Sequence, residues 1–274
     1  MDGSDSILPS GMPIARRGLC VLAQPCLRLP HHANRFRFLE ASILLVGSGK
    51  LSVDQDGSTT LLEGPSALLA VAQNVCADLQ KTPGGPDLIF RSLFLTLSPE
   101  LIRQFHQHHE LENLSPPLSG CSAVPLDDDL AETLNHCLRG MDAARVSDRL
   151  LRHRLLGLLL ALAERGIWFA APAYQSVGNL LRSLLSDTPG QQWTTAKAGR
   201  ELAMSEATLR RRLAAEHLRF ETLLLEVRMH HAMALLQSTG WSIPQVAQAC
   251  GYQAHSRFSL RFRERFGCSP SQVR

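Results

Sequence analysis

The chain has 274 residues, an apolar fraction of 45% and a formal net charge of +3. These values exclude a wholly disordered protein and leave room for two domains, each with its own core. The charge is uneven: residues 176–274 hold 13 Lys and Arg against 7 Asp and Glu, whereas residues 1–175 hold 15 against 18. A basic C-terminal third beside a mildly acidic remainder is typical of a nucleic-acid module joined to another domain.

Cysteine usage and hydropathy narrow the class of protein further. The seven cysteines are scattered and include no C-x-x-C pair, so neither a zinc site nor a disulfide framework is predicted, and reduced thiols in the cytoplasm are expected. The N-terminus is acidic and lacks the apolar segment of a secretory signal. The longest apolar run, residues 155–163, is about half of what a membrane span needs. We therefore expect a soluble protein with no membrane contact.

The first 165 residues divide into an arm and a strand-rich domain that ends in helices. Residues 1–17, rich in Ser, Pro and Gly, are predicted to be a flexible arm. Between residues 18 and 97, short apolar runs alternate with turn residues, and Asp56-Gly57 is a hairpin signal. This pattern predicts a small antiparallel barrel or sandwich. The strand-like runs are residues 19–22, 42–46, 51–53, 60–62, 67–71 and 89–97.

Helical patterns follow from Ser98, which is a candidate N-cap before Pro99. Two further helices are predicted near residues 127–141 and 146–165, the first beginning in an acidic run that suits a helix N-terminus. The second carries four leucines on one face, which either pack within their own domain or form a dimer seam. These leucines are Leu151, Leu155, Leu158 and Leu162. Residues 166–175, with Pro172, are the candidate linker to the next domain.

Residues 176–274 have a helical pattern throughout and contain two similar units. In 243–266, a short helix after Ser242 and a Gly251-Tyr252 break precede a helix with phenylalanines at i, i+4 and i+8 among arginines. In 195–216, Thr195 is a candidate cap, and a second helix follows Ser205. Each unit has the pattern of a helix-turn-helix. An uninterrupted helix, residues 220–238, joins them and is about 28 Å long, close to the roughly 34 Å between successive major-groove faces of DNA.

This C-terminal third resembles the DNA-binding domain of AraC/XylS-family transcription regulators. The resemblance depends on Gly251-Tyr252 with the residues that follow it, and in the first unit on Met204-Ser205 and Leu209. The following residues are Phe258, Phe262, Arg263, Phe266, Gly267, Ser269 and Pro270. Within the family, Leu209-Arg-Arg-Arg-Leu213 is similar to the acid-stress and virulence regulators of proteobacteria. The resemblance implies promoter DNA and RNA polymerase as partners and activation of transcription, and it allows a homodimer.

The family also implies roles for individual side chains on the two recognition helices. The positions that correspond to base-reading residues are Ala207, Arg210, Arg211, His255, Ser256, Arg257 and Ser259. Arginine there can donate two hydrogen bonds to guanine, worth about 1–3 kcal/mol of discrimination. Leu260 also matches but offers only an apolar contact. Phosphate contacts, which orient without specifying sequence, are assigned to Thr195, Arg212, Ser242, Arg261 and Arg263; Arg212 departs from the family, which usually has an apolar residue there.

The strand-rich region resembles the cupin-like sensor domain of such regulators, which implies control by a small-molecule effector or a regulatory protein. The alternative is a cupin-type metal enzyme fused to a DNA-binding domain, with His31, His32 and Glu40 as its site. Adjacent histidines in a strand point to opposite faces, so the two cannot bind one ion inside a barrel. No catalytic constellation, metal site or cofactor is therefore predicted, and the sequence favours a regulator of α+β class.

Overall fold

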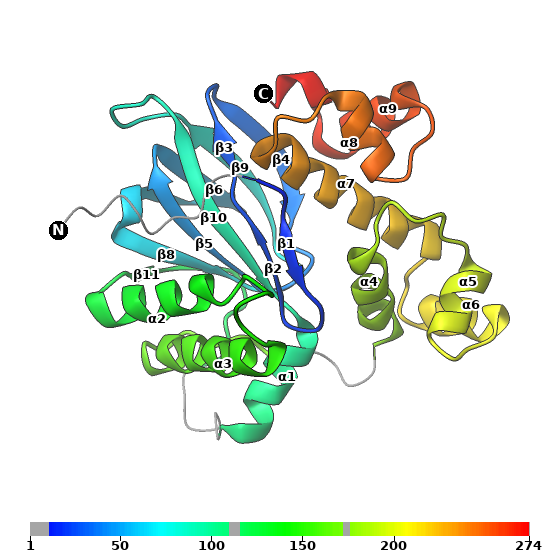
Figure 1. Ribbon diagram of the computed structural model, residues 1–274, viewed down its shortest axis with the longest axis horizontal. Coiled ribbons are helices and arrows are strands. Elements are labelled where there is room, and N and C mark those ends of the chain that lie inside the picture. The colour runs from blue at the N-terminus through cyan, green and yellow to red at the C-terminus, as the bar shows by residue number, and fades with distance from the viewer. Residues whose placement is uncertain (1–10, 110–115, 172–175, 274) are drawn as a thin grey trace. The chain divides into compact units, whose positions relative to one another are not determined.

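The computed structural model describes residues 11–109, 116–171 and 176–273, and the chain divides into two compact units. Met1–Ala171 form the N-terminal unit and Pro172–Val273 the C-terminal unit, a division that falls inside the predicted linker. Among the described residues, the first unit combines strands with helices and the second is helical (Figure 1). The predicted α+β class is confirmed. In these ranges no helix is both long and apolar enough to cross a membrane.

The strands of the N-terminal unit form two open antiparallel sheets. The first has the order β1–β2–β10–β5–β8–β11, with β3 also pairing with β10, and the second has the order β4–β9–β6–β7. The first contains β1 (Ile14–Arg16), β2 (Cys20–Ala23), β3 (Cys26–Leu27), β5 (Ser42–Ser48), β8 (Ala67–Val71), β10 (Phe90–Leu97) and β11 (Cys121–Pro125). The second contains β4 (His31–Arg37), β6 (Lys50–Gln55), β7 (Ser58–Glu63) and β9 (Cys76–Thr82). Of the two predicted forms, the sandwich is confirmed and the closed barrel is wrong.

Alternating side chains give the first sheet two buried faces. Ile43 and Leu45 of β5 belong to the core shared with the helices. Phe94 of β10 packs towards the second sheet, where its ring centroid lies 5.8 Å from that of Phe38 and 6.2 Å from that of Phe36. Because strand side chains alternate between faces, β5 and β10 carry apolar side chains towards both of them.

The hairpin between β6 and β7 is the one that the sequence predicts. Asp56 and Gly57 form a two-residue loop, with φ of 52° and 85°, and Gln55 pairs with Ser58 across it. Positive φ at both loop residues is the requirement of a type I′ turn, which Asp-Gly satisfies at low cost. The Asp-Gly signal is therefore confirmed.

Three helices cover the N-terminal unit: α1 (Pro99–His108), α2 (Asp128–Arg139) and α3 (Asp148–Glu164). Ser98, Asp127 and Ser147 cap them, each accepting a backbone N–H three residues on. The predicted dimer seam on α3 is wrong. Its four leucines are completely buried in the core with α1, α2 and the first sheet, so they have no surface for a partner. They are Leu151, Leu155, Leu158 and Leu162.

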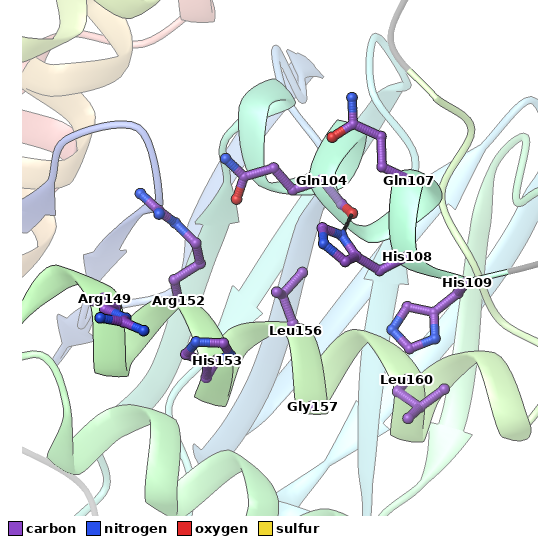
Figure 2. Close-up of a pocket in the computed structure, with 10 residues that line it drawn as sticks. All are labelled: Gln104, Gln107, His108, His109, Arg149, Arg152, His153, Leu156, Gly157 and Leu160. Carbon is purple, nitrogen blue, oxygen red and sulfur yellow. Dashed lines mark hydrogen bonds between the residues drawn. The ribbon is translucent and has the colours of Figure 1, made fainter.

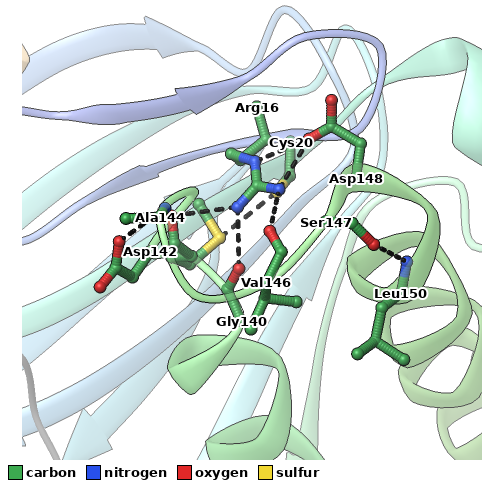
Figure 3. A network of polar contacts seen from close by, with 10 residues as sticks. Arg16, Cys20, Gly140, Asp142, Ala144, Val146, Ser147, Asp148 and Leu150 are labelled. Atoms are coloured by element: carbon green, nitrogen blue, oxygen red, sulfur yellow. Dashed lines mark hydrogen bonds and ion pairs between the residues drawn. The ribbon is translucent and has the colours of Figure 1, made fainter.

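The predicted flexible arm is also wrong for its last residues, because β1 belongs to the sheet. Arg16 is 5% exposed and fixes β1 to the loop between α2 and α3 (Figure 3). Its guanidinium donates to the carbonyl oxygens of Gly140 at 2.9 Å and Val146 at 2.8 Å, and to the Asp148 carboxylate at 2.7 Å. The network gives the buried guanidinium its hydrogen-bond acceptors and gives these two loop carbonyl oxygens a donor. Residues 1–10 of the predicted arm lie outside the described residues.

The beginning of the predicted linker packs against the N-terminal unit. Phe169 is 4% exposed, and its backbone oxygen lies 2.8 Å from Nε2 of His106 on α1. Leu118 donates its backbone N–H to Trp168 at 2.8 Å. Residues 166–169 are therefore part of the N-terminal unit, and residues 172–175 of the prediction lie outside the described ranges.

The C-terminal unit consists of short helices around one long helix. They are α4 (Val177–Asp187), α5 (Thr195–Glu201), α6 (Glu206–Ala215), α7 (Phe220–Ser238), α8 (Ile243–Ala249), α9 (His255–Phe266) and a final 3₁₀ turn, Pro270–Gln272. Helix α7 has the predicted bounds. Its first half contributes Phe220, Leu223 and Val227 to a core with α4, α5 and α6. Because α7 also contacts α8 and α9, it supports both helical pairs.

Candidate nucleic-acid interface

Helices α5 and α6 form the first helix-turn-helix. The turn between them contains Ala203 with φ of 54°, and Gly199 lies under it. A Cβ on Gly199 would come within 2.9 Å of the Met204 carbonyl oxygen, so the close approach of helix and turn requires glycine there. Ser205 caps α6 through the backbone N–H of Thr208 at 3.1 Å. The tight turn between α5 and α6 therefore depends on the small Gly199, on the positive φ of Ala203 and on the Ser205 cap.

The predicted cap of α5 is one residue out. Thr194 occupies the N-cap position and accepts the backbone N–H of Lys197 at 3.1 Å. Thr195 is the first helical residue and is only 6% exposed, because its side chain packs into the unit. Its capping role is wrong, and a side chain so covered gives no basis for the phosphate contact assigned to it. Thr194 is exposed instead, so its side chain has the accessible surface that a phosphate contact needs.

Helix α6 presents arginines on the face opposite its buried leucines. Leu209 and Leu213 are 0% and 1% exposed. The predicted readers and the predicted phosphate contact on this helix are all exposed; they are Ala207, Arg210, Arg211 and Arg212. Arg210 pairs with Glu206 one turn earlier, at 2.7 Å. That ion pair orients the guanidinium along the helix and engages one of its three nitrogens.

Helices α8 and α9 form the second helix-turn-helix. Ser242 is at the N-cap of α8, and the Gln245 side chain accepts its backbone N–H at 2.8 Å, which is half of a capping box. Gly251 in the break has φ of +77°, a conformation that side chains rarely adopt. The stripe on α9 is buried as predicted, with Phe258 and Phe262 0% exposed. Adjacent rings in the stripe pack against one another, with centroids 5.8 Å apart for that pair.

The surface of α9 opposite that stripe is polar and basic. Its exposed residues include the predicted readers His255, Ser256 and Arg257, together with Leu260 and Arg263, whereas Ser259 is half-buried. Leu260 is 57% exposed. Arg261 forms an ion pair with Glu264 at 2.8 Å, and this partner raises the pKa of the arginine. The structure thus places six of the seven predicted readers on exposed helix faces, three on α6 and three on α9.

A residue that sequence reasoning missed connects the two helical pairs. Arg228 of α7 donates to the carbonyl oxygens of Pro189 at 3.1 Å and Gln191 at 2.9 Å, in the loop before α5. Its guanidinium also lies over the ring of Tyr252, after α8. A Cβ on Gly251 would meet this guanidinium at 2.5 Å. The available signal was a single arginine inside the apolar run of a long helix.

Burial of the Arg228 guanidinium is unfavourable for its positive charge, and the polar contacts of this side chain offset that cost. Desolvation lowers the pKa of Arg228, and the neighbouring Tyr252 opposes that shift. The same loop contacts α8 directly: a Cβ on Gly190 would come within 2.5 Å of the Ala249 carbonyl oxygen. The first and second helix-turn-helix units are therefore held by one contact region as well as by the shared helix.

The residues of the alternative metal site do not converge. His31 of β4 is 3% exposed, whereas its neighbour His32 is exposed and points to the other face. Burial, together with Lys81 and His32, lowers the pKa of His31 to about 4. Among the described residues, no group of three or more His, Cys, Asp or Glu is placed to hold a metal ion.

Comparison with known proteins agrees with this arrangement. A family of helix-turn-helix domains matches residues 199–274. The HTH-type transcriptional regulator GadX of Escherichia coli K12 is 27% identical over 186 residues, which cover 66% of this chain and 65% of GadX. The chain thus spans less than two thirds of GadX. The transcriptional activator AggR of Escherichia coli is 23% identical over 249 residues, which cover 87% of this chain and 92% of AggR.

A solved structure is similar in fold. It is that of unsaturated fatty acid bound wild-type ToxT from Vibrio cholerae strain SCE256, with a TM-score of 0.59 over 97% of this chain and 96% of ToxT, at 14% identity. At that identity the likeness concerns the fold alone. Residues 199–274 thus match a helix-turn-helix domain family, and the chain is similar to the transcriptional regulators GadX and AggR.

Proposed function

We propose that this chain is a sequence-specific DNA-binding regulator of transcription that places α6 and α9 in successive major grooves of promoter DNA. The observation that carries the proposal is the pair of exposed, arginine-bearing helices supported by one continuous helix. Helix α7 has 19 residues, and at 1.5 Å per residue it is about 28 Å long. Successive grooves on one side of DNA repeat at about 34 Å, a length that this spacer approaches.

The side chains on the two helices divide into two roles. Arg210, Arg211 and Arg257 are long enough to donate paired hydrogen bonds to guanine, and shorter polar side chains beside them add single contacts. Those shorter side chains are His255, Ser256 and Ser259, with Ala207 making an apolar contact. Arg212, Arg261, Arg263 and Ser242 are assigned to phosphate, which sets register. Because Leu260 cannot donate a hydrogen bond, α6 is the more discriminating helix.

The proposed direction and control of regulation are extended from the relatives. AggR is named a transcriptional activator, and we extend activation, with RNA polymerase as partner in the cytoplasm, to this chain. The strand-rich unit is then the place where a small ligand or a regulatory protein acts. ToxT, which shares the fold, has been solved with an unsaturated fatty acid. A homodimer is compatible with this function, although the α3 leucines do not form its interface.

Selection from random-sequence duplexes tests the proposal directly. The purified full chain is expected to enrich one motif with two conserved blocks whose centres are about ten base pairs apart. A matched control carries Arg210→Ala, Arg211→Ala and Arg257→Ala together, all on exposed positions that leave the helical core intact. Enrichment of no motif, or of the same motif by the triple variant, would contradict sequence-specific binding by these helices.

A further inference from the structure

Two features of the described residues have no part in the proposed DNA contacts. One is a hollow between α1 and α3, which Gln104 and His108 border on one side and Arg152 and Leu156 on the other (Figure 2). The described residues do not show what covers this hollow. The other feature is a set of hydrogen bonds between the end of α6 and the beginning of α4. The carboxylate of Glu216 accepts all of them, and they bear on how α6 is held.

The Glu216 carboxylate accepts three hydrogen bonds from the beginning of α4. The backbone N–H groups of Val177 and Gly178 donate to it at 2.6 Å and 2.9 Å, and the hydroxyl of Ser176 donates at 2.8 Å. The N–H groups of a first turn have no acceptor within their own helix, and the helix dipole favours negative charge there. Glu216 follows α6 directly in the chain. These bonds therefore join the end of a recognition helix to the start of α4.

The chain reversal at the end of α6 brings two side chains to α4. His217 has a φ of 56°, and Leu218 donates its backbone N–H to the Leu213 carbonyl oxygen at 2.8 Å, which is the bond of a Schellman motif. Glycine is the usual residue at the position of His217, so the left-handed conformation is kept here despite a side chain. The motif turns the chain so that Glu216 and Leu218 both contact α4.

A glycine in the first turn of α4 makes room for these side chains. Gly178 is buried, and a Cβ there would overlap Cδ1 of Leu218 and come within 2.9 Å of the Glu216 carboxylate. The close approach therefore requires glycine, although glycine is a poor helix former. Further along, α4 shares an apolar core with α6. Helix α4 thus supports α6 through its buried face and through the carboxylate.

We propose that Glu216 is a positioning residue for sequence reading, which holds α6 on α4 so that Arg210 and Arg211 meet their base pairs. The inference rests on the proposed DNA-binding function. Helix α6 has 10 residues and α5 has seven, so the first pair is small and takes its support from α4. Paired hydrogen bonds to guanine need a fixed geometry, and a small tilt of α6 reduces discrimination. Helix α9 is held instead by α7 and α8.

Base-pair scanning of the selected site with full-chain Glu216→Gln tests the proposal. Glutamine has the same length, but it offers one acceptor oxygen and turns an N–H₂ donor towards donors. Discrimination should fall about fivefold at the base pairs that Arg210→Ala relaxes, and it should stay at the wild-type level at those that Arg257→Ala relaxes. Gly178→Ala, which separates α4 from the end of α6 without changing a charge, should give the same one-sided loss.

Glu201→Gln is the matched control, because it removes one negative charge from an exposed position at the end of α5. It should keep wild-type discrimination in both halves of the site. A purely structural role for Glu216 would lower the melting temperature and the active fraction of Glu216→Gln and leave its discrimination intact. That result, or an equal loss of discrimination in both halves, would overturn the proposal.

Ser176→Ala is a milder variant that tests the same contact if Glu216→Gln does not fold. It removes one of the three donors to Glu216, so discrimination should fall by a smaller factor in the α6 half alone. Wild-type discrimination by folded Ser176→Ala and Gly178→Ala would overturn the proposal. A wild type without any base preference would overturn both this inference and the proposed function, whereas unchanged discrimination in the variants would overturn this inference alone.

Discussion

The guanidinium of Arg228 lies over the ring of Tyr252, with its Cζ 5.6 Å from the ring centroid. The same guanidinium donates to two carbonyl oxygens of the loop that leads into α5. One side chain of the spacer helix thus contacts the approach to the first helix-turn-helix and the break of the second. A fixed distance between the recognition helices depends on this joint as well as on the stiffness of α7.

Replacing Arg228 with methionine tests the joint. Methionine keeps the apolar stem but leaves the Pro189 and Gln191 carbonyls without their donor, so we expect a loss of about 1–3 kcal/mol in the free energy of unfolding. The variant should also tolerate a one-base-pair insertion between the two halves of the site better than the wild type does. Arg219→Met, at the exposed start of the same helix, is the control and should change neither. If Arg228→Met and the wild type were equally sensitive to the insertion, the Arg228 contacts would not fix the distance between the two recognition helices.

Arg263 provides a test of phosphate contact. Because counterion release contributes about one unit of salt slope for each neutralised phosphate, Arg263→Ala should lower the slope of log K against log salt by about one. It should also weaken all DNA sequences alike. Titrations at four salt concentrations, on the selected site and on an unrelated duplex, measure both quantities. A loss confined to the selected site would make Arg263 a base reader instead.

The Arg16 network predicts the stability of the N-terminal unit. Arg16→Met should destabilise it by about 2–3 kcal/mol, since the Gly140 and Val146 carbonyls lose their buried donor. Asp148→Asn should cost under about 1 kcal/mol, because the carboxylate is 61% exposed and exposed ion pairs contribute little. Urea denaturation of both variants compares the contribution of the carbonyl contacts with that of the ion pair. If Asp148→Asn were the more damaging change, the ion pair and not the carbonyl contacts would fix β1.

Lys81 on β9 makes stability depend on pH. Burial lowers its pKa from 10.5 to about 7, so between these values the unfolded chain binds more protons and the free energy of unfolding rises with pH. Below pH 7 both states are protonated and the cost of burying the charge is fully present. The stability advantage of Lys81→Met should therefore shrink by about 1.4 kcal/mol per unit between pH 7.5 and 8.5.

Urea denaturation at these two pH values measures that change. Lys50→Met, at an exposed lysine paired with Glu63, should show no such trend. The window lies above that of His31, whose folded pKa is about 4 against 6.5, so the histidine does not contribute to the difference. A constant advantage of Lys81→Met across the window would mean that Lys81 titrates as an exposed lysine does.

How far the sequence predicts this molecule depends on how local each signal is. Helix α7 and both helix-turn-helix pairs follow from apolar periodicity and from Gly251 and Ser205, which act over a few residues. Strand β4 was not expected, because its alternation breaks at a bulge where Arg35 has φ of 49°. Strand β9 places Lys81 on its buried face, which hides the pattern of period two. In both cases a tertiary contact outweighs the local signal.

The candidate interface shows the same limit. Periodicity separates the exposed arginines of α6 and α9 from the buried stripes, so their exposure could be predicted. It cannot tell whether the inner face of α3 meets its own sheet or a second copy, because both would require leucines at the same spacing. Arg228 depends on partners 37 and 39 residues away, and only the folded chain brings them together.

The central claim is that α6 and α9 read different parts of one site, and base-pair scanning of the selected site with Arg210→Ala and Arg257→Ala tests it most directly. Each variant should bind about 1–3 kcal/mol more weakly and lose preference at its own base pair. The account predicts that the two relaxed positions lie about ten base pairs apart, in adjacent major grooves. Relaxation of the same base pair by both variants would contradict it.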